Sequence, residues 1–381
     1  MLVSRDVLER PPVDRAGDRD PLVAAGPSLR ILLVHEMFAP DFRGGGEYVV
    51  LEAARILQAR GMSVRVLCAG DPAMRAYEGI ATRRLRRPRH MMNLAVASVA
   101  RAARDADLVH TFTYNAAWAG MLGARLAGKP CVLGVLGLFG QAWLDMRGAI
   151  AGRLRIAGEH VLMRGLADRI LFLSDGSRDV GVAFGADPAR CRVVPPGIDE
   201  RCFAPGAAKS DTVLFIGKVD VRKGIGEVLA AAAALPHIPF RIVGWGEAFG
   251  EWAARAPANA TFVPYERGPA AFTEFARARL FVLPSHAETF GLAVAEAMAS
   301  GCAVVSSVGL PFAGARVQAG DAQAVTDAIR RLWEDRDACA RAAEENRERA
   351  KCFTWAAHGA GLEAVYREIL AAPAAPSRPR R

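Results

Sequence analysis

Short runs of β-branched and apolar residues alternate along this chain with longer segments of helical periodicity. From residue 30 the segments RILLVHEM, YVVLEAARILQARG and SVRVLCAG follow the pattern of a strand, a helix and a second strand. Further apolar runs continue the series at residues 106–112, 129–137, 168–175 and 191–197. This alternation predicts a parallel sheet with helices on both faces.

A second series of the same kind follows a segment of glycine, proline and charged residues at 200–211. Its predicted strands are TVLFIGKV, FRIVGWG, ATFVPY, ARLFVLPS and CAVVSSVG, and helical patterns such as AQAVTDAIRRLWEDR lie between them. A chain of 381 residues has room for two domains of ordinary size. We therefore expect an α/β fold of two doubly wound domains, with ligands at the carboxyl ends of the strands and in the cleft between the domains.

The same patterns predict the limits of each part. We expect a disordered tail at 1–28, a first domain at 29–203, a second domain at 204–353, an amphipathic final helix at 354–371 and a basic tail at 372–381. The N-terminal tail lacks the apolar core of a signal peptide, and the longest apolar runs are too short to span a bilayer. The seven cysteines are scattered without C-x-x-C spacing, which suggests neither disulfides nor zinc and favours the cytoplasm.

The formal charge of +9 is concentrated in part in RRLRRPRH at residues 83–90. Such a patch is compatible with nucleic acid, anionic lipid or phosphorylated ligands. No nucleic-acid-binding module accompanies it, so we do not expect nucleic acid. Together with the helix that follows it, residues 83–104 are expected on the first domain, in peripheral contact with an anionic membrane at its inner face. A solvated patch beside a core-packed helix is the equal alternative.

Two glycine turns precede predicted helices, where backbone N–H groups and the helix dipole attract anions. One is GGGE after the first strand, with Gly45 and Gly46, although a tight turn explains a triglycine equally well. The other is TFGLAVAEAMASG, in which Gly291 lets a ligand approach the first helical turn and Gly301 ends the helix. Both turns are candidate phosphate sites.

Two glutamates lie eight positions apart around the second turn. Glu288 belongs to the loop before the helix, whereas Glu296 lies in the second turn of the helix, so the two carboxylates can address one ligand from different directions. Glu296 interrupts an otherwise apolar helix, and a buried carboxylate is costly unless something binds it. The alternative is a solvated loop residue and a surface helical residue.

Cations follow the first strand of the second domain, in GKVDVRKG. Lys218 and Lys223 could grip a diphosphate without a metal ion, although charged loop residues are often only solvated. The D-x-D triplets at residues 18–20, 105–107 and 335–337 lie in the tail, ahead of a strand and within a helix pattern. No metal site is predicted from them.

Taken together, several of these motifs resemble the retaining GT-B glycosyltransferases of family 4. The motifs are GGGE, SDGSRDV near 174, PPGID at 195–199, GKVDVRKG at 217–224, GWGE at 244–247 and PSHAETFGLAVAEAMASG at 284–301. The resemblance runs from about residue 30 to 370. It implies two Rossmann-like domains and a final helix that crosses back to the first domain. It also implies metal-independent transfer of a sugar from a nucleoside-diphosphate sugar to a hydroxyl of a sugar or lipid-linked acceptor. Such a reaction would belong to glycan, polysaccharide or glycolipid synthesis. The donor is a substrate, and no cofactor is implied.

The resemblance also implies roles for individual residues. Glu296 would bind the ribose of the donor, and Glu288 would lie near the transferred sugar as a catalytic residue. Lys223 would bind the diphosphate and take part in catalysis, with Lys218 where an arginine is more usual. The remaining predicted donor contacts are Gly45, Gly46, Gly291 and Leu292.

Two histidines that are common in the family are missing. Relatives often carry H-x-H after the third strand, where this chain has His110 and then Phe112, and a histidine before glycine where it has Leu136. His110 is a candidate catalytic residue and equally a satisfied core histidine, while Phe112, Tyr114 and Asn115 are expected to line the cleft. The alternatives are a GT-B nucleotide-sugar epimerase or phosphorylase, or a non-catalytic nucleotide-sugar binder.

Overall fold

The structure is a computed structural model that describes residues 28–41, 44–204, 209–266 and 269–371. The predicted tails at 1–28 and 372–381 lie outside the described residues, apart from Ser28. No observation tests the predicted domain limits, which stay predictions.

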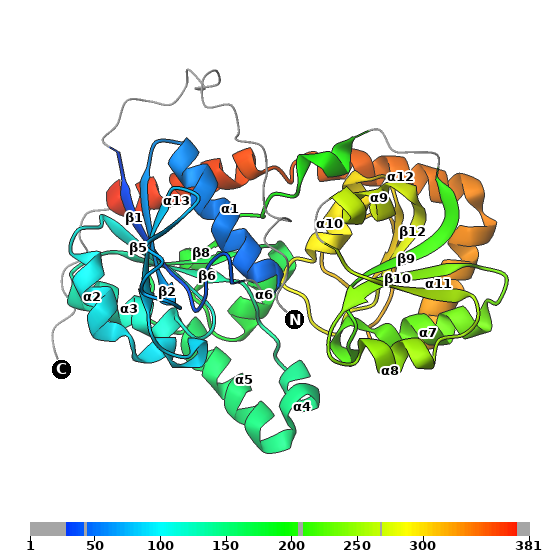
Figure 1. The fold of residues 1–381 in the computed structure, drawn as a ribbon, viewed down its shortest axis with the longest axis horizontal. Helices are drawn as coiled ribbons and strands as arrows, with labels where there is room; N and C mark the ends of the chain where they lie inside the picture. The colour runs from blue at the N-terminus through cyan, green and yellow to red at the C-terminus, as the bar shows by residue number, and fades with distance from the viewer. Residues whose placement is uncertain (1–27, 42–43, 205–208, 267–268, 372–381) are drawn as a thin grey trace.

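The first sheet has eight strands in the order β3-β4-β2-β1-β5-β6-β7-β8 (Figure 1). All neighbouring strands are parallel except β3 and β4, an antiparallel edge that the sequence did not predict. Ile31 and Leu33 of β1 join one buried cluster and Leu32 and Val34 join another, so both faces of the sheet are covered. The strands are β1 (Arg30–Val34), β2 (Ser63–Ala69), β3 (Ala76–Tyr77), β4 (Ile80–Leu85), β5 (Leu108–Phe112), β6 (Cys131–Val135), β7 (Arg169–Phe172) and β8 (Cys191–Val193).

Helices connect these strands. Ser174 begins α6 with a capping box, in which its side chain and that of Ser177 each accept a backbone N–H of the other residue. The helices are α1 (Gly45–Ala59), α2 (Val96–Ala103), α3 (Ala117–Leu126), α4 (Ala142–Arg147), α5 (Ala149–Met163) and α6 (Asp175–Ala183), with short 3-10 helices at Arg89–Leu94, Pro188–Arg190 and Glu200–Phe203.

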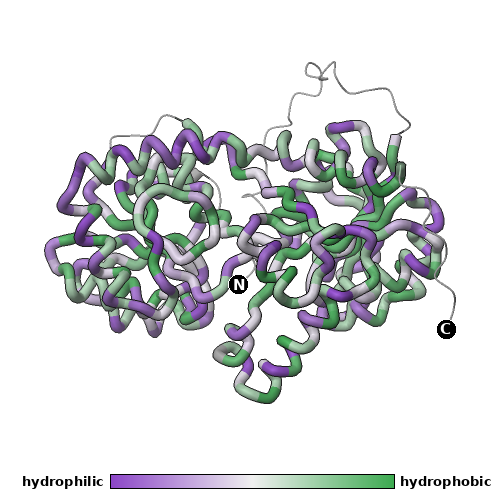
Figure 2. The backbone as a smooth tube through the Cα atoms, turned by 180° about the vertical axis from the view of Figure 1, so that it is seen from behind, coloured by the Kyte–Doolittle hydropathy of each residue, from purple (hydrophilic) through white to green (hydrophobic). Residues whose placement is uncertain are grey.

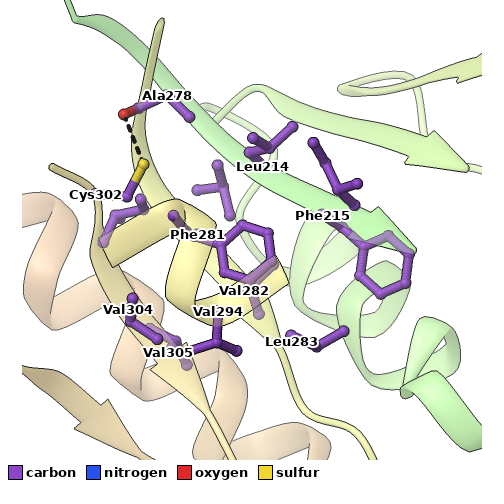
Figure 3. Packing of buried hydrophobic residues seen from close by; sticks show 14 of the residues in the cluster. Leu214, Phe215, Ala278, Phe281, Val282, Leu283, Val294, Cys302, Val304 and Val305 are labelled. Carbon is purple, nitrogen blue, oxygen red and sulfur yellow. Dashed lines mark hydrogen bonds between the residues drawn. The ribbon is translucent and has the colours of Figure 1, made fainter. Parts of the chain in front are cut away.

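The second sheet has six parallel strands in the order β11-β10-β9-β12-β13-β14. Its core is continuous with α10, as Figure 3 shows, where Val294 of the helix packs against Val304 and Val305 of β13. The two sheets lie beside each other in Figure 1. The elements are β9 (Ser210–Lys218), a 3-10 helix (Val221–Lys223), α7 (Ile225–Ala234), β10 (Phe240–Trp245), α8 (Phe249–Ala254), β11 (Ala260–Pro264), α9 (Pro269–Arg277), β12 (Ala278–Leu283), α10 (Leu292–Ala299), β13 (Ala303–Ser306), β14 (Gly314–Arg316), α11 (Ala322–Glu334) and α12 (Arg336–Ala350).

The last helix, α13 (Trp355–Ala371), returns from the second sheet to pack on α1 (Figure 1). Arg60, which caps the C-terminus of α1, donates to Glu363 at 2.7 Å, and a Cβ at Gly359 would lie only 2.6 Å from Ile56 of α1. Two buried histidines hold the same helix: His110 Nδ1 lies 2.7 Å from the Tyr366 hydroxyl, and His358 Nδ1 donates to the Pro195 carbonyl at 2.9 Å. The attachment of α13 therefore depends on imidazoles without access to water.

This attachment predicts a loss of stability in mild acid. Burial, with a smaller contribution from His358, lowers the pKa of His110 to about 3, and burial lowers the pKa of His358 to about 4. The unfolded chain takes up these protons below about pH 6.5 and the folded chain does not, so stability is complete above that pH and falls below it. We expect each histidine to contribute a loss of about 2 kcal/mol between pH 6.5 and pH 5.

Melting curves across that pH range measure the effect. In His358→Asn an amide replaces the donating nitrogen without titrating, so its melting temperature should fall less steeply with acid than that of the wild type. The exposed His237→Asn is the matched control and should follow the wild type. A flat wild-type profile would contradict the explanation.

Candidate functional site

The two domains meet where α1 begins, where β6 ends and where α10 begins. A Cβ at Gly45 would lie 3.0 Å from Leu292 Cδ1, and one at Gly46 would lie 3.6 Å from Leu136 Cδ1. The Thr289 hydroxyl donates to the Leu136 carbonyl at 3.1 Å. The structure therefore brings together three residues predicted as donor contacts, Gly45, Gly46 and Leu292, although no observation tests their roles.

The start of α10 requires the predicted glycine. Gly291 has φ of 89°, and a Cβ at this position would lie 2.8 Å from Val308 Cγ1. The first amides of a helix have no hydrogen-bond partner within the helix. The N–H groups of Leu292 and Ala293 can therefore donate hydrogen bonds to an anion at this end of α10.

Glu296 lies on the half-buried side of α10, whereas the following residues 297–299 are buried. Its carboxylate lies near Cys202, since burial and then the charge of Glu296 raise the pKa of that thiol. The sequence placed Glu296 in a buried apolar helix, and the structure places it at the margin of that buried face.

Lys223 and Glu288 form an ion pair across two loops of the second domain, and each side chain is only about one-sixth exposed. Asp220 caps the short helix that carries Lys223 by accepting the Lys223 amide at 3.1 Å. Burial and the charge of Arg222 lower the pKa of Lys223, while Asp220 raises it. The contact with Glu288 also favours the charged lysine, because an adjacent carboxylate stabilises an ammonium. Two residues predicted as catalytic therefore lie in contact.

Arg222 is a part of this region that the sequence interpretation missed. Its guanidinium donates to the Ala287 carbonyl at 3.2 Å, and its own carbonyl accepts the His286 amide at 2.8 Å. The guanidinium also lies 5.6 Å from the ring centroid of Phe139 in the first domain, within reach of a cation–π contact. The sequence around Arg222 does not predict this contact with the other domain.

Lys218 lies at the end of β9 and is half exposed. Its ammonium is 3.4 Å from Asp220. Lys218 also pairs in register with Trp245, whose ring packs at a tilt against Tyr265 with the ring centroids 4.8 Å apart. The structure thus places Lys218 beside an aromatic pair rather than in the ion pair of Lys223.

His110 lies in the core of the first domain and not on its surface. Its ring packs on Phe112 with centroids 4.3 Å apart, and a Cβ at Gly134 would lie 2.7 Å from Nε2. Phe112 is itself buried, which contradicts its expected place in the cleft, because its side chain joins the cluster between β5 and α13. A catalytic role for His110 stays a prediction, and the observed contacts account for the residue as a packed partner of Tyr366.

Glu159, a buried carboxylate of α5, organises the adjacent wall and was also missed. It accepts four hydrogen bonds, from the Tyr114 hydroxyl at 2.6 Å and from the Phe139 amide, the Gly140 amide and Trp143 Nε1, each at 2.9 Å. The rings of Tyr114, Phe139 and Trp143 pack together. One carboxylate therefore holds the loop that presents Phe139 to Arg222.

The arginine patch at 83–90 is divided between the interior and the surface, so not all of its charge is available to a ligand or a membrane. Arg84 is buried, donates to the Phe38 and Ala39 carbonyls and pairs with Asp41 at 3.1 Å. Arg86 and Arg87 instead line an open hollow of about 570 Å³ together with Gly70, Asp71 and Pro88.

Within the described ranges, no group of three His, Cys, Asp or Glu side chains is placed to hold a metal ion. Of the D-x-D triplets, Asp107 pairs with Arg30 at 2.6 Å and Asp335 caps α12. Residues 18–20 lie outside the described part. No helix in the described ranges combines the length and hydropathy needed to cross a membrane.

Comparison with known proteins matches both halves of the chain. Residues 43–201 match the profile of Glycosyltransferase Family 4, and residues 210–335 match that of Glycosyl transferases group 1. The D-inositol 3-phosphate glycosyltransferase of Mycobacterium avium is 30% identical over 318 residues, which cover 71% of this chain and 74% of that protein.

Solved structures are similar in fold at lower identity. Sucrose-phosphate synthase from Thermosynechococcus elongatus superposes with a TM-score of 0.77 at 22% identity, covering 90% of this chain and 99% of that one. Anabaena HepE in complex with UDP-glucose superposes with a TM-score of 0.71 at 18% identity, covering 89% and 100%.

From the four hydrogen bonds that Glu159 accepts, we predict that Glu159→Ala destabilises the loop around residues 137–143. The substitution leaves buried donors without an acceptor, so we expect a loss of about 3 kcal/mol or more and faster proteolysis within residues 137–143. Glu159→Gln keeps one acceptor oxygen, so its stability should lie between those of the wild type and Glu159→Ala. Melting curves and limited proteolysis measure both effects, with the exposed Glu344→Ala as the control. Wild-type behaviour of Glu159→Ala would show that the network is not needed.

Proposed function

The chain belongs to glycosyltransferase family 4 and has the GT-B fold, and from this premise we propose that it transfers a sugar from a nucleoside-diphosphate sugar to a hydroxyl acceptor, with retention of configuration and without a metal ion. The matching profiles and relatives confirm the predicted family and enzyme class, a glycosyltransferase. The similar solved structures confirm the predicted fold class. The observation that carries the finer proposal is the Lys223–Glu288 pair at the carboxyl edge of the second sheet, beside the first turn of α10.

The donor diphosphate would lie between Lys223 and the amides at the start of α10. A phosphate that pairs with Lys223 releases Glu288, whose carboxylate is then free to contact the sugar. As the bond between the anomeric carbon and the phosphate oxygen breaks, negative charge grows on the diphosphate. The Lys223 ammonium and the helix amides stabilise that charge, and this supports a reaction without a metal ion.

Retention would follow if the acceptor hydroxyl attacks the anomeric carbon on the face that the diphosphate leaves. The hydroxyl proton then passes to the departing phosphate oxygen, so that no protein base is needed. The contact between Arg222, which precedes Lys223, and Phe139 joins the two domains and would help to exclude water that hydrolyses the donor. Proton NMR of the first-formed product identifies its anomeric configuration, and inversion would contradict the mechanism.

We propose a phosphate-bearing polyol as the acceptor class. Arg86 and Arg87 line the open hollow beside the carboxyl end of β4, and arginine pairs well with phosphate. The Mycobacterium avium relative is named for D-inositol 3-phosphate, which is such a compound. A cytoplasmic enzyme in peripheral contact with an anionic membrane would also meet lipid-linked acceptors of similar charge.

One set of assays tests the whole proposal. Donor turnover is measured over a panel of nucleotide sugars with phosphorylated and neutral acceptors, with and without EDTA and with and without inorganic phosphate. Transfer that survives EDTA supports the proposal. Turnover that needs inorganic phosphate would favour a phosphorylase, conversion of the donor without acceptor would favour an epimerase, and donor binding without turnover would favour a non-catalytic binder.

Lys223→Ala should lower kcat much more than donor affinity, because the charge that Lys223 stabilises is greatest in the transition state. We expect a decrease of on the order of a hundredfold or more. Steady-state kinetics together with calorimetric donor binding separate the two quantities. Lys351→Ala, which removes an exposed lysine paired with Glu348, is the control. Unchanged turnover in Lys223→Ala would make this lysine a structural partner of Glu288 only.

Glu296→Ala should weaken donor binding without loss of stability. Hydrogen bonds to a charged group contribute about 1.5–3 kcal/mol each, so the loss of ribose contacts should raise the donor Kd by roughly one to three decades. Glu296→Gln keeps the shape and one acceptor and should lose less. Calorimetric titration and melting curves decide the matter, with the exposed Glu251→Ala as the control. Normal donor binding combined with early unfolding would make Glu296 structural.

A further inference from the structure

Helices α4 and α5 form a hairpin that projects from the first domain (Figures 1 and 2). Gly152, Glu159, Leu162 and Met163 form the inner, buried face of α5. A Cβ at Gly152 would lie 2.8 Å from Leu144 Cα, so the two helices are in close contact. The inner face of α5 is therefore fully used by packing.

The outer face of α5 carries an apolar stripe in solvent. Ile150 is 81% exposed, Leu154 is 71% exposed and Val161 is 54% exposed. At 100° per residue these three positions lie within an arc of about 40°, opposite the buried face. A helix that is apolar on both faces is normally covered on both.

The charged side chains described beside the stripe are positive. Arg153 is exposed on α5, and Arg147 ends α4 next to Met146, which is 38% exposed. Glu159 is the acid of α5, and it is turned inward, where it accepts four hydrogen bonds. The outer face of α5 therefore combines large apolar side chains with an arginine and no carboxylate.

An anionic bilayer fits this combination better than a second copy of the chain. In a symmetric pair the same surface would meet itself and bring like charges together. On a bilayer the apolar side chains would enter the boundary between headgroups and acyl chains, and the arginines would contact anionic headgroups.

The surface first considered for membrane contact, residues 83–104, is less suited. Arg84 is buried, and α2 buries Val99, Ala102 and Ala103. Its exposed residues are Ala97 and Arg101, followed by Arg104 at its C-terminal end. Leu94 is exposed at 69% but lies ahead of that helix, in a 3-10 segment. The residues described there form no apolar stripe along α2.

We propose that the outer face of the α4–α5 hairpin, with Met146, Ile150, Leu154 and Val161, docks on an anionic lipid surface. The same helix holds the wall of the cleft through Glu159, about one helix diameter, or ~10 Å, behind the docked face. If the proposed function holds, docking brings the acceptor side of the cleft close to the headgroups. The docking itself does not depend on that function.

Vesicle flotation with the full chain tests the proposal without donor or acceptor. The wild type should float with vesicles of mixed phosphatidylglycerol and phosphatidylcholine, less at high salt and less with phosphatidylcholine alone. The double variant Ile150→Ser, Leu154→Ser should lose at least tenfold in bound fraction. Arg147→Gln, Arg153→Gln should reduce binding to the anionic vesicles only.

Two matched variants control for exposed apolar area and for charge elsewhere. Leu122→Ser, Leu126→Ser removes exposed leucines of α3, and Arg83→Gln, Arg86→Gln removes arginines of the 83–90 segment. Both should float like the wild type. Melting curves and transfer to a soluble acceptor should be unchanged in the Ile150, Leu154 variant, which separates a failure of docking from a failure of catalysis.

Three results would overturn the proposal. The first is that the wild type does not float with the vesicles. The second is that the Ile150, Leu154 variant floats as well as the wild type. The third is that only the Arg83, Arg86 variant loses vesicle binding. Analytical sedimentation tests the rival explanation. If the wild type is a dimer that binds no lipid, and substitution of Ile150 and Leu154 makes it a monomer, the stripe is an interface between two copies of the chain.

Discussion

Hydrogen bonds and an ion pair fix most positions of the loop at residues 284–291. The arrangement of both domains around the candidate site depends on this loop. Arg222 holds the loop through its carbonyl and its guanidinium, and Lys223 pairs with Glu288. Thr289 then joins the first domain, since its hydroxyl donates to Leu136 and its carbonyl accepts from Ser174 at 2.7 Å. A segment with so many partners can change only when the two domains change with it. Any movement of Glu288 is thereby linked to the contact between the domains.

Buried charge does similar work in the first domain. Glu159 faces four donors in a place without water, and a carboxylate in such a place is stable only because the donors are all present. Arg84 is the cationic counterpart, satisfied by carbonyls of the loop after β1 and by Asp41. Both residues fix loops at the carboxyl edge of the first sheet. The shape of this edge of the first domain thus depends on buried polar groups.

The same packing explains why the charged segments could not be read as surfaces. The segment RRLRRPRH carries positive charge along most of its length in the sequence. Residues of β4 alternate between the two faces of the sheet, however, so Arg84 points inward while Arg83 points outward. In α5 the periodicity shows an apolar face, and the structure shows two, of which only the inner one is covered. Charge and hydropathy in a sequence therefore indicate a surface only after the strand or helix has been placed.

The sequence by itself determined the central parallel strands of both sheets, the helices between them and the GT-B family, because period-two and period-3.6 patterns and glycine turns are local properties of the chain. It also located the turn at Gly291 and the candidates Lys223 and Glu288. It did not show the strands β3, β4 and β14. Only the tertiary structure decided that this lysine and glutamate pair with each other, that His110 is packed in the core, that Arg222 contacts Phe139 of the other domain, and that Glu159 holds the loop that carries Phe139. Residues such as Arg222 and Phe139 are distant in sequence and belong to different domains, and their contact depends on how two independently formed sheets meet, which no local pattern encodes.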